Sequence, residues 1–197
     1  MRAIKFISLF LLCAFAASAA TVRDYAEKIA PLIDPAKLAT LKPRGANPRV
    51  QKVTFWLATA RADGVRPGAV VDAALLQVGI TNKAAADLTR AAMLRNITIA
   101  ERLGCLDEAG LAEMRKGNAA TVRRGPYAGD ELSVDHIIPY AVVPELDKVF
   151  ANLELMPQRA NARKNSSIGQ RQRSLARDLH KAGLLSNDGL RRCSNAR

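Results

Sequence analysis

Apolar residues recur at helical spacing through residues 22–114, which favours a mostly helical fold for this part of the chain. In the clearest example, Val53, Trp56, Leu57 and Ala60 recur at i, i+3, i+4 and i+7, the pattern of one buried helix face. This kind of spacing occurs in four segments: 23–30, 48–62, 68–78 and 82–103. Turn-forming residues separate the segments. We therefore expect a mostly helical fold, with Trp56 in the core and no catalytic group in this half, which would serve packing or substrate contact.

Residues 1–20 follow a different pattern, which predicts that they are removed. Arg2 and Lys5 precede an apolar stretch, and small residues fill positions 16–20. This order is typical of a secretory signal peptide cleaved after Ala19 or Ala20. The alternative is an uncleaved membrane anchor, but the uncharged run 6–22 is marginal in length for spanning a bilayer. We expect a secreted or periplasmic bacterial protein that has no stable membrane association after cleavage.

The positive charge of the chain is concentrated toward its C-terminal end. The sequence has 30 Lys and Arg against 18 Asp and Glu, a net charge of +12. Residues 21–114 contribute 13 basic against 10 acidic residues, whereas residues 115–197 contribute 15 against 8. Such a balance favours a polyanionic partner, either nucleic acid or an anionic membrane surface. A soluble basic protein with neither partner is an equal alternative on charge alone.

The chain changes character after Lys116, which suggests two regions, 21–114 and 115–197. Residues 117–138 combine Gly-rich turns with short β-prone runs and suggest a small hairpin. Residues 152–177 are polar, basic and compatible with a helix. The expected fold class is therefore α+β and mostly helical, with a helical N-terminal region and a small mixed C-terminal module.

The residues with the most chemical meaning are Asp135, His136 and Asn161. Hydrolysis of a phosphodiester needs a base for the attacking water, positive charge at the phosphate oxygens and stabilisation of the leaving oxygen. A histidine is a suitable base near neutral pH. Asp and Asn supply the hard oxygen ligands that Mg²⁺ or Mn²⁺ prefers, and a divalent cation can fill both electrostatic roles.

These residues belong to a longer pattern that resembles a known nuclease family. Asp135-His136-Ile137-Ile138-Pro139 is followed by Asn152-Leu153 and then by Asn161-Ala162-Arg163-Lys164. This order and spacing are similar to the HNH, or ββα-metal, motif in its variant with Asn at the last metal-binding position. The resemblance covers about residues 120–170 and implies a ββα-metal nuclease module within residues 115–197.

The resemblance also implies a role for each matching residue. His136 would be the general base, and Asp135 and Asn161 would bind Mg²⁺ or Mn²⁺. Asn152 would lie in the loop between the second strand and the helix and orient the His136 imidazole. Lys164 would contact the scissile phosphate. With Asn at position 161 the site has one charged ligand, which predicts weak metal affinity.

Four arginines are weaker candidates for nucleic-acid contact. Arg124 and Arg163 flank the motif, and Arg171 and Arg173 belong to a basic segment, 159–181, that fits a phosphate backbone. A solvated helix face is the ordinary alternative for such a segment. Few aromatic residues accompany it, so stacking on single-stranded bases is not supported. The expected activity is cleavage of nucleic acid, DNA rather than RNA, with weak sequence selectivity.

Two other functions remain open at this stage. A secreted antibacterial toxin similar to the colicin-type DNases would use the same chemistry and would need an immunity protein as partner. A basic nucleic-acid-binding protein without catalytic activity is the alternative from another class, although the full set of motif residues disfavours it.

The two cysteines outside the signal peptide, Cys105 and Cys193, allow two interpretations. In an oxidising compartment they can form one disulfide between the middle and the end of the chain. The alternative is a pair of separate buried thiols. Their spacing lacks paired CxxC motifs, so we expect no structural zinc site.

Overall fold

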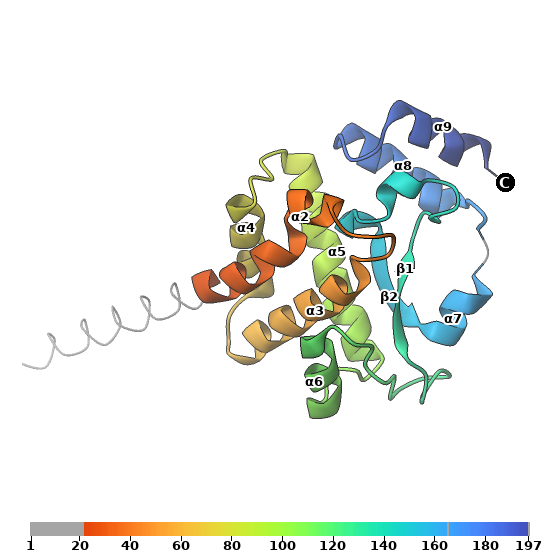
Figure 1. The fold of residues 1–197 in the computed structure, drawn as a ribbon. Helices are drawn as coiled ribbons and strands as arrows, with labels where there is room; N and C mark the ends of the chain where they lie inside the picture. Colours follow the sequence, from red (N-terminus) through yellow and green to blue (C-terminus); the bar gives the residue numbers. More distant parts are fainter. Residues whose placement is uncertain (1–21, 165, 197) are drawn as a thin grey trace, which may run out of the picture.

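The computed structural model describes residues 22–164 and 166–196, and the expected signal peptide lies outside these ranges. The described chain is mostly helical and has one two-stranded antiparallel sheet (Figure 1). The expected α+β, mostly helical class is therefore confirmed at this level. Within the described ranges, no helix has the length and apolar character needed to cross a membrane.

The N-terminal region is a set of helices whose positions follow the apolar spacing. A helix covers residues 22–33. It is followed by five more: α2 (Pro35–Ala39), α3 (Asn47–Ala62), α4 (Pro67–Gln77), α5 (Lys83–Arg102) and α6 (Glu108–Lys116). The four predicted helical segments are confirmed, with their ends shifted by a few residues at most. The side chains of Asn82 and Asp107 cap α5 and α6, accepting hydrogen bonds from the backbone N–H groups of Ala85 and Gly110.

The sheet is built from residues that are far apart in the sequence. β1 (Leu132–His136) pairs with β2 (Leu153–Pro157), so that Asp135 lies opposite Glu154. The segment between the strands contains two short 3₁₀ helices, η1 (Pro144–Leu146) and η2 (Phe150–Asn152). The hairpin expected within 117–138 is present as a short antiparallel pairing, with a bridge between Thr121 and Glu131 and backbone hydrogen bonds from Val122 to Asp130 and from Leu132 to Ala120. The longer strand pairing of the sheet, between β1 and β2, was not expected.

The prediction of helix across 152–177 was also wrong at its start. Leu153 and Leu155 are buried in β2 against the N-terminal helices, and this tertiary contact overrides the polar, helix-compatible composition around them. Helical structure begins only afterwards, in α7 (Gln158–Arg163) and α8 (Gln170–Lys181), followed by α9 (Asn187–Asn195).

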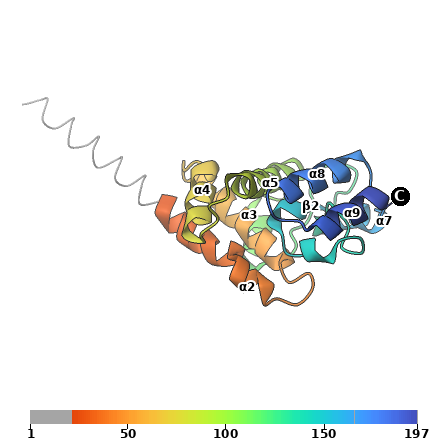
Figure 2. The same cartoon turned by 90° about the horizontal axis from the view of Figure 1, so that it is seen from above.

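One hydrophobic core joins the N-terminal helices to the sheet. Leu57 of α3 and Met93 of α5 belong to the same buried cluster as Leu132 of β1 and Leu153 and Leu155 of β2. Two buried side chains also tie the helices to the strands. Gln51 Nε2 donates to the Leu132 carbonyl at 2.8 Å, while Asn96 accepts from the Leu155 N–H at 3.0 Å and donates to the Leu153 carbonyl at 3.3 Å. The helices therefore hold the sheet from one side, and α7, α8 and α9 lie toward its other side (Figures 1 and 2).

The cysteines belong to two different cores. Cys105 is buried in the cluster just described, and Cys193 of α9 is buried in a second cluster with Ile138, Leu146 and Leu179. Both are free thiols, so the disulfide considered from the sequence is not formed. Burial raises the pKa of Cys105 to about 11 and also raises the pKa of Cys193. The structure therefore corresponds to the second interpretation, two separate buried thiols.

Candidate active site

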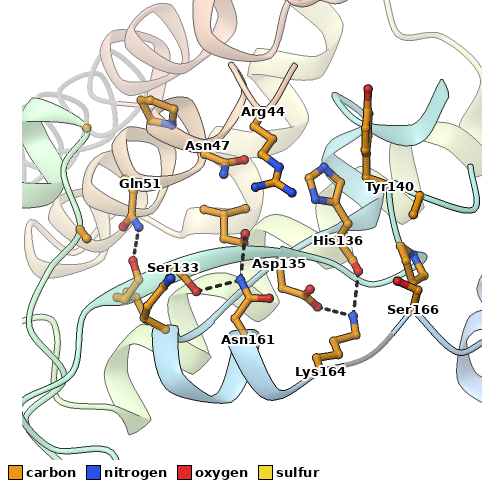
Figure 3. A pocket seen from close by; sticks show the side chains of 18 residues that line it. Arg44, Asn47, Gln51, Ser133, Asp135, His136, Tyr140, Asn161, Lys164 and Ser166 are labelled. Carbon is orange, nitrogen blue, oxygen red and sulfur yellow. Dashed lines mark hydrogen bonds and ion pairs between the residues drawn. The ribbon is translucent and has the colours of Figure 1, made fainter. Parts of the chain in front are cut away.

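The residues with the most chemical meaning meet at one cleft of about 450 Å³ (Figure 3). Asp135 and His136 come from the end of β1, Asn161 from α7 and Lys164 from the position directly after α7. The opposite wall comes from the start of α3 and the turn before it. Residues far apart in the sequence thus surround a single space large enough for a small ligand or part of a larger one.

Asp135 is a buried carboxylate with a cationic partner. It is 7% exposed, and Lys164 Nζ lies 2.5 Å from its Oδ2. The same ammonium donates to the backbone carbonyls of His136 at 2.8 Å and Ile137 at 3.3 Å. Lys164 therefore does not extend freely into the cleft, as a phosphate contact would, but lies among three oxygens at the end of β1.

A second buried acid explains why cations gather at this face of the sheet. Glu154 lies directly opposite Asp135 in the antiparallel register, so the two carboxylates are cross-strand neighbours that repel each other. Arg95 lies 3.1 Å from Glu154, and Arg171 of α8 forms a two-pronged ion pair with the same carboxylate. The hydrogen bonds to Glu154 raise the pKa of Arg171, whereas burial lowers the pKa of Arg95.

The four arginines predicted to contact nucleic acid do not gather at the cleft. Arg171 is engaged with Glu154, and Arg173 donates to the backbone carbonyl of Ala196 at 2.8 Å. Arg124 and Arg163 are exposed, but neither lines the cleft. Arg171 therefore has a structural partner within the chain, Glu154, that was not expected from the sequence.

Asn161 is oriented so that its amide oxygen lies on the side of Asp135. Its Nδ2 donates to Ser133 Oγ at 3.0 Å and to the Val134 carbonyl at 3.4 Å, and Figure 3 shows the Oδ1 atom turned toward the Asp135 carboxylate. These two oxygens are the groups that could hold a divalent cation. Among the described residues no group of three or more His, Cys, Asp or Glu is placed so that it could hold a metal ion. A cation here would thus have one carboxylate and one amide as protein ligands and would keep several of its own waters.

His136 is held by Asp147, a residue that the sequence did not single out. The imidazole is 8% exposed, and its Nε2 lies 3.0 Å from the Asp147 carbonyl oxygen and 3.1 Å from Asp147 Oδ1. A carbonyl oxygen only accepts hydrogen bonds, so Nε2 must carry the hydrogen. In the neutral ring Nδ1 is then the basic nitrogen, and it has no hydrogen-bond partner in the described part of the chain.

The prediction that Asn152 orients this ring was wrong. Asn152 ends η2, directly before β2, and does not lie between the second strand and the helix. Its fully buried side chain accepts from the Ile138 N–H at 2.8 Å and donates to the Ile138 carbonyl at 3.0 Å. Asn152 therefore fixes the backbone two residues after His136, while Asp147 holds the imidazole itself.

Arg44 brings the N-terminal region into the cleft. It lies in the turn between α2 and α3, and Figure 3 shows its side chain extending toward His136. Its φ of 60° is the only positive value at a non-glycine position among the described residues, a conformation that costs about 1–2 kcal/mol. The strain is held in place because the Arg44 N–H donates to both carboxylate oxygens of Asp147, at 3.0 and 3.1 Å.

No relative emerges from comparison with known proteins. No family model, curated protein or solved structure matches the chain. The functional interpretation of the cleft therefore depends on its own residues and geometry.

Sequence reasoning missed the two residues that connect the walls of the cleft, Arg44 and Asp147. The only local signal for Arg44 is its position between Pro43 and Gly45, in a turn so tight that a Cβ at Gly45 would lie 2.8 Å from the Lys42 carbonyl. Asp147 has no local signal, because its partners lie 11 and 103 residues away. The N-terminal half was expected to serve packing or substrate contact. Arg44 lines the cleft, so a substrate contact by this residue would agree with that expectation.

Proposed function

We propose that this protein is a metal-dependent endonuclease of the HNH type that hydrolyses phosphodiester bonds in nucleic acid. The observation that carries the proposal is that Asp135, His136 and Asn161 line one cleft, where Nδ1 of the imidazole has no hydrogen-bond partner among the described residues and Asp135 and Asn161 offer two hard oxygen ligands. Residues 120–164 would then be the ββα-metal unit, with β1, β2 and α7 as its elements.

In this proposal His136 accepts the proton of the attacking water. Asp147 fixes the hydrogen on Nε2, which leaves Nδ1 as the base. The Asp147 carboxylate also stabilises the imidazolium that forms when the proton is taken. Asn152 keeps the segment after His136 in one conformation through its two hydrogen bonds to Ile138.

Asp135 and Asn161 fit a divalent cation by the chemistry of their donors. Both offer oxygen atoms, and the hydrogen bonds of the Asn161 amide nitrogen turn its oxygen toward Asp135. Bound Mg²⁺ or Mn²⁺ would supply positive charge at the phosphate and leaving oxygens. Lys164 is paired with Asp135 Oδ2, so a bound divalent cation would share this carboxylate with the ammonium.

The charge of the chain favours a nucleic acid as the polyanionic substrate. The net charge is +12, and the larger share of the basic excess lies in residues 115–197. Double-stranded DNA is the preferred candidate, recognised mainly through its backbone.

The pattern of residues 1–20 further suggests that the protein is exported. N-terminal sequencing of secreted material tests this suggestion. A start at Ala20 or Thr21 supports export, and a retained Met1 contradicts it.

Plasmid cleavage tests the proposed activity. The purified protein should convert supercoiled plasmid to nicked or linear forms with Mg²⁺ or Mn²⁺ and should lose this activity in EDTA. Asp135→Asn removes the one charged ligand and should raise the metal concentration needed for half-maximal cleavage by about tenfold or more. A protein that leaves both plasmid and RNA intact with every divalent ion tried would refute the endonuclease proposal.

A further inference from the structure

The cations that line the cleft differ in whether their charge is balanced. Among the described residues two cations line it, Lys164 and Arg44. Lys164 is paired with the buried carboxylate of Asp135. The guanidinium of Arg44 makes no hydrogen bond or ion pair within the described part of the chain, although its backbone N–H is fully engaged with Asp147. Arg44 therefore presents an unbalanced positive charge in the cleft.

The backbone of Arg44 is held by hydrogen bonds on both sides, although its side chain is exposed. Asp147 holds the Arg44 N–H, and the Arg44 carbonyl accepts from the Asn47 N–H at 3.1 Å. Lys148, which follows Asp147 in the sequence, donates from its ammonium to two carbonyls. One belongs to Ala39 at the end of α2, and the other to Leu41 in the turn between α2 and α3. The turn between α2 and α3 is thus fastened to the segment that also holds His136.

We propose that Arg44 is a substrate-contacting residue that binds a phosphate group of the nucleic acid beside His136. A guanidinium donates two parallel hydrogen bonds to phosphate oxygens, so an unpaired arginine in a cleft that is lined by a histidine base fits a phosphodiester. Asp147 binds both the backbone N–H of Arg44 and the His136 ring, and Figure 3 shows the Arg44 side chain extending toward His136. In this arrangement the N-terminal helical region supplies part of the active site. The inference rests on the proposed endonuclease function.

Replacement by glycine tests this role without disturbing the fold. Arg44→Gly keeps the backbone N–H that binds Asp147 and relieves the positive φ, so the variant should unfold at a temperature no lower than the wild type. Lys42→Ala is the matched control, because it removes one positive charge from the same turn but from a residue that does not line the cleft.

The measurements are binding of a short DNA duplex in EDTA over a range of salt concentrations, and cleavage with Mg²⁺ or Mn²⁺. Arg44→Gly should lower kcat/KM by about 10- to 100-fold and reduce the slope of log affinity against log salt by about one. Arg44→Lys should restore the salt slope and only part of kcat, because an ammonium lacks the two-pronged geometry. Lys42→Ala should change kcat/KM by less than about threefold.

Two results would overturn the inference while leaving the endonuclease proposal intact. In the first, a wild-type enzyme cuts DNA and Arg44→Gly cuts and binds equally well. In the second, Lys42→Ala loses as much activity as Arg44→Gly, which would make the effect one of general charge. A wild-type protein that cuts no nucleic acid refutes the proposed function itself, and the phosphate role of Arg44 with it.

Discussion

At the scale of single residues, Asp147 has the largest influence on the candidate active site. Its carbonyl and carboxylate oxygens hold the His136 ring, and its carboxylate also holds the backbone of Arg44. Asp147 is 5% exposed, so solvent has little access to the oxygens that make these contacts. One buried carboxylate thus contacts the ring of the proposed base and the backbone of the proposed phosphate-binding residue.

Asp147→Ala should therefore lower kcat by about 10- to 100-fold, because the imidazole loses the carboxylate that orients it. KM should change less than kcat. Asp147→Asn keeps an acceptor oxygen for the Nε2–H and should recover part of that loss. Steady-state kinetics of both variants on a plasmid or duplex substrate measure the effect. Asp72→Ala, an exposed acid on α4 that pairs with Arg90, is the matched control. A kcat for Asp147→Ala equal to that of the wild type would show that the ring is oriented by other groups.

At the scale of secondary structure, the position of β2 depends on α5. Asn96 projects from α5 and binds backbone groups of Leu153 and Leu155, and its own side chain is 2% exposed. Buried backbone groups need partners, so this one side chain satisfies two groups of the strand that pairs with β1. The cleft residues at the end of β1 therefore depend on a helix of the N-terminal region.

Asn96→Ala should lower the free energy of unfolding by about 1–3 kcal/mol, because it leaves a buried N–H and a weakly bonded carbonyl without a partner. Urea denaturation followed by circular dichroism measures the change. Asn195→Ala, at an exposed position near the end of α9, should have little effect. If the two substitutions destabilise the protein equally, the Asn96 contacts do not hold the strand.

The helices could be predicted from the sequence, and the sheet could not. Apolar residues such as Val53 and Leu57 repeat within one or two turns, so their pattern is local. Each strand has five residues, and β1 finds its partner only after a segment with two 3₁₀ helices. Pairing over that distance depends on burial of Leu153 and Leu155 against α3 and α5, which no local pattern records.

The same distinction explains which site residues could be predicted. Asp135, His136, Asn161 and Lys164 lie within 30 positions of one another, and their spacing led to the expectation that they act together. The structure brings all four to one cleft. Arg44 reaches the same cleft through a contact with a residue 103 positions away, and its left-handed backbone has no signature in the sequence.

At the scale of the whole molecule, residues 22–164 and 166–196 form two hydrophobic clusters, with one buried thiol in each. Cys105 lies with the N-terminal helices and the sheet, and Cys193 lies with α8 and α9. The structure thus requires no covalent link between the clusters, even for a protein proposed to be exported.

Both thiols of the mature chain should resist alkylation at pH 8 in the native protein and react fully in denaturant. Burial raises the pKa of Cys105 to about 11 and raises that of Cys193, so neither is a thiolate at this pH. The pKa of the Cys105 thiol is higher in the folded protein than in the unfolded chain. Protonation of this thiol therefore contributes its full stabilisation of the folded state below about pH 8.5, and the stabilisation is lost as the pH rises toward 11. Mass spectrometry after iodoacetamide treatment counts the labelled thiols. If neither thiol reacts when the protein is denatured without a reductant, the two cysteines form a disulfide instead.

Substitution of the only two histidines of the chain, His136 and His180, tests whether His136 is the base of an endonuclease. His180 lies on α8, where its Nε2 is 2.8 Å from Asn187 Oδ1, and it does not line the cleft. The measurement is the rate of plasmid cleavage by the wild type, His136→Ala and His180→Ala with Mg²⁺ or Mn²⁺. If His136 is the base, the rate falls by about 10²-fold or more in His136→Ala and stays within about twofold of the wild type in His180→Ala. Cleavage by His136→Ala at the wild-type rate would contradict the assignment of His136 as the base.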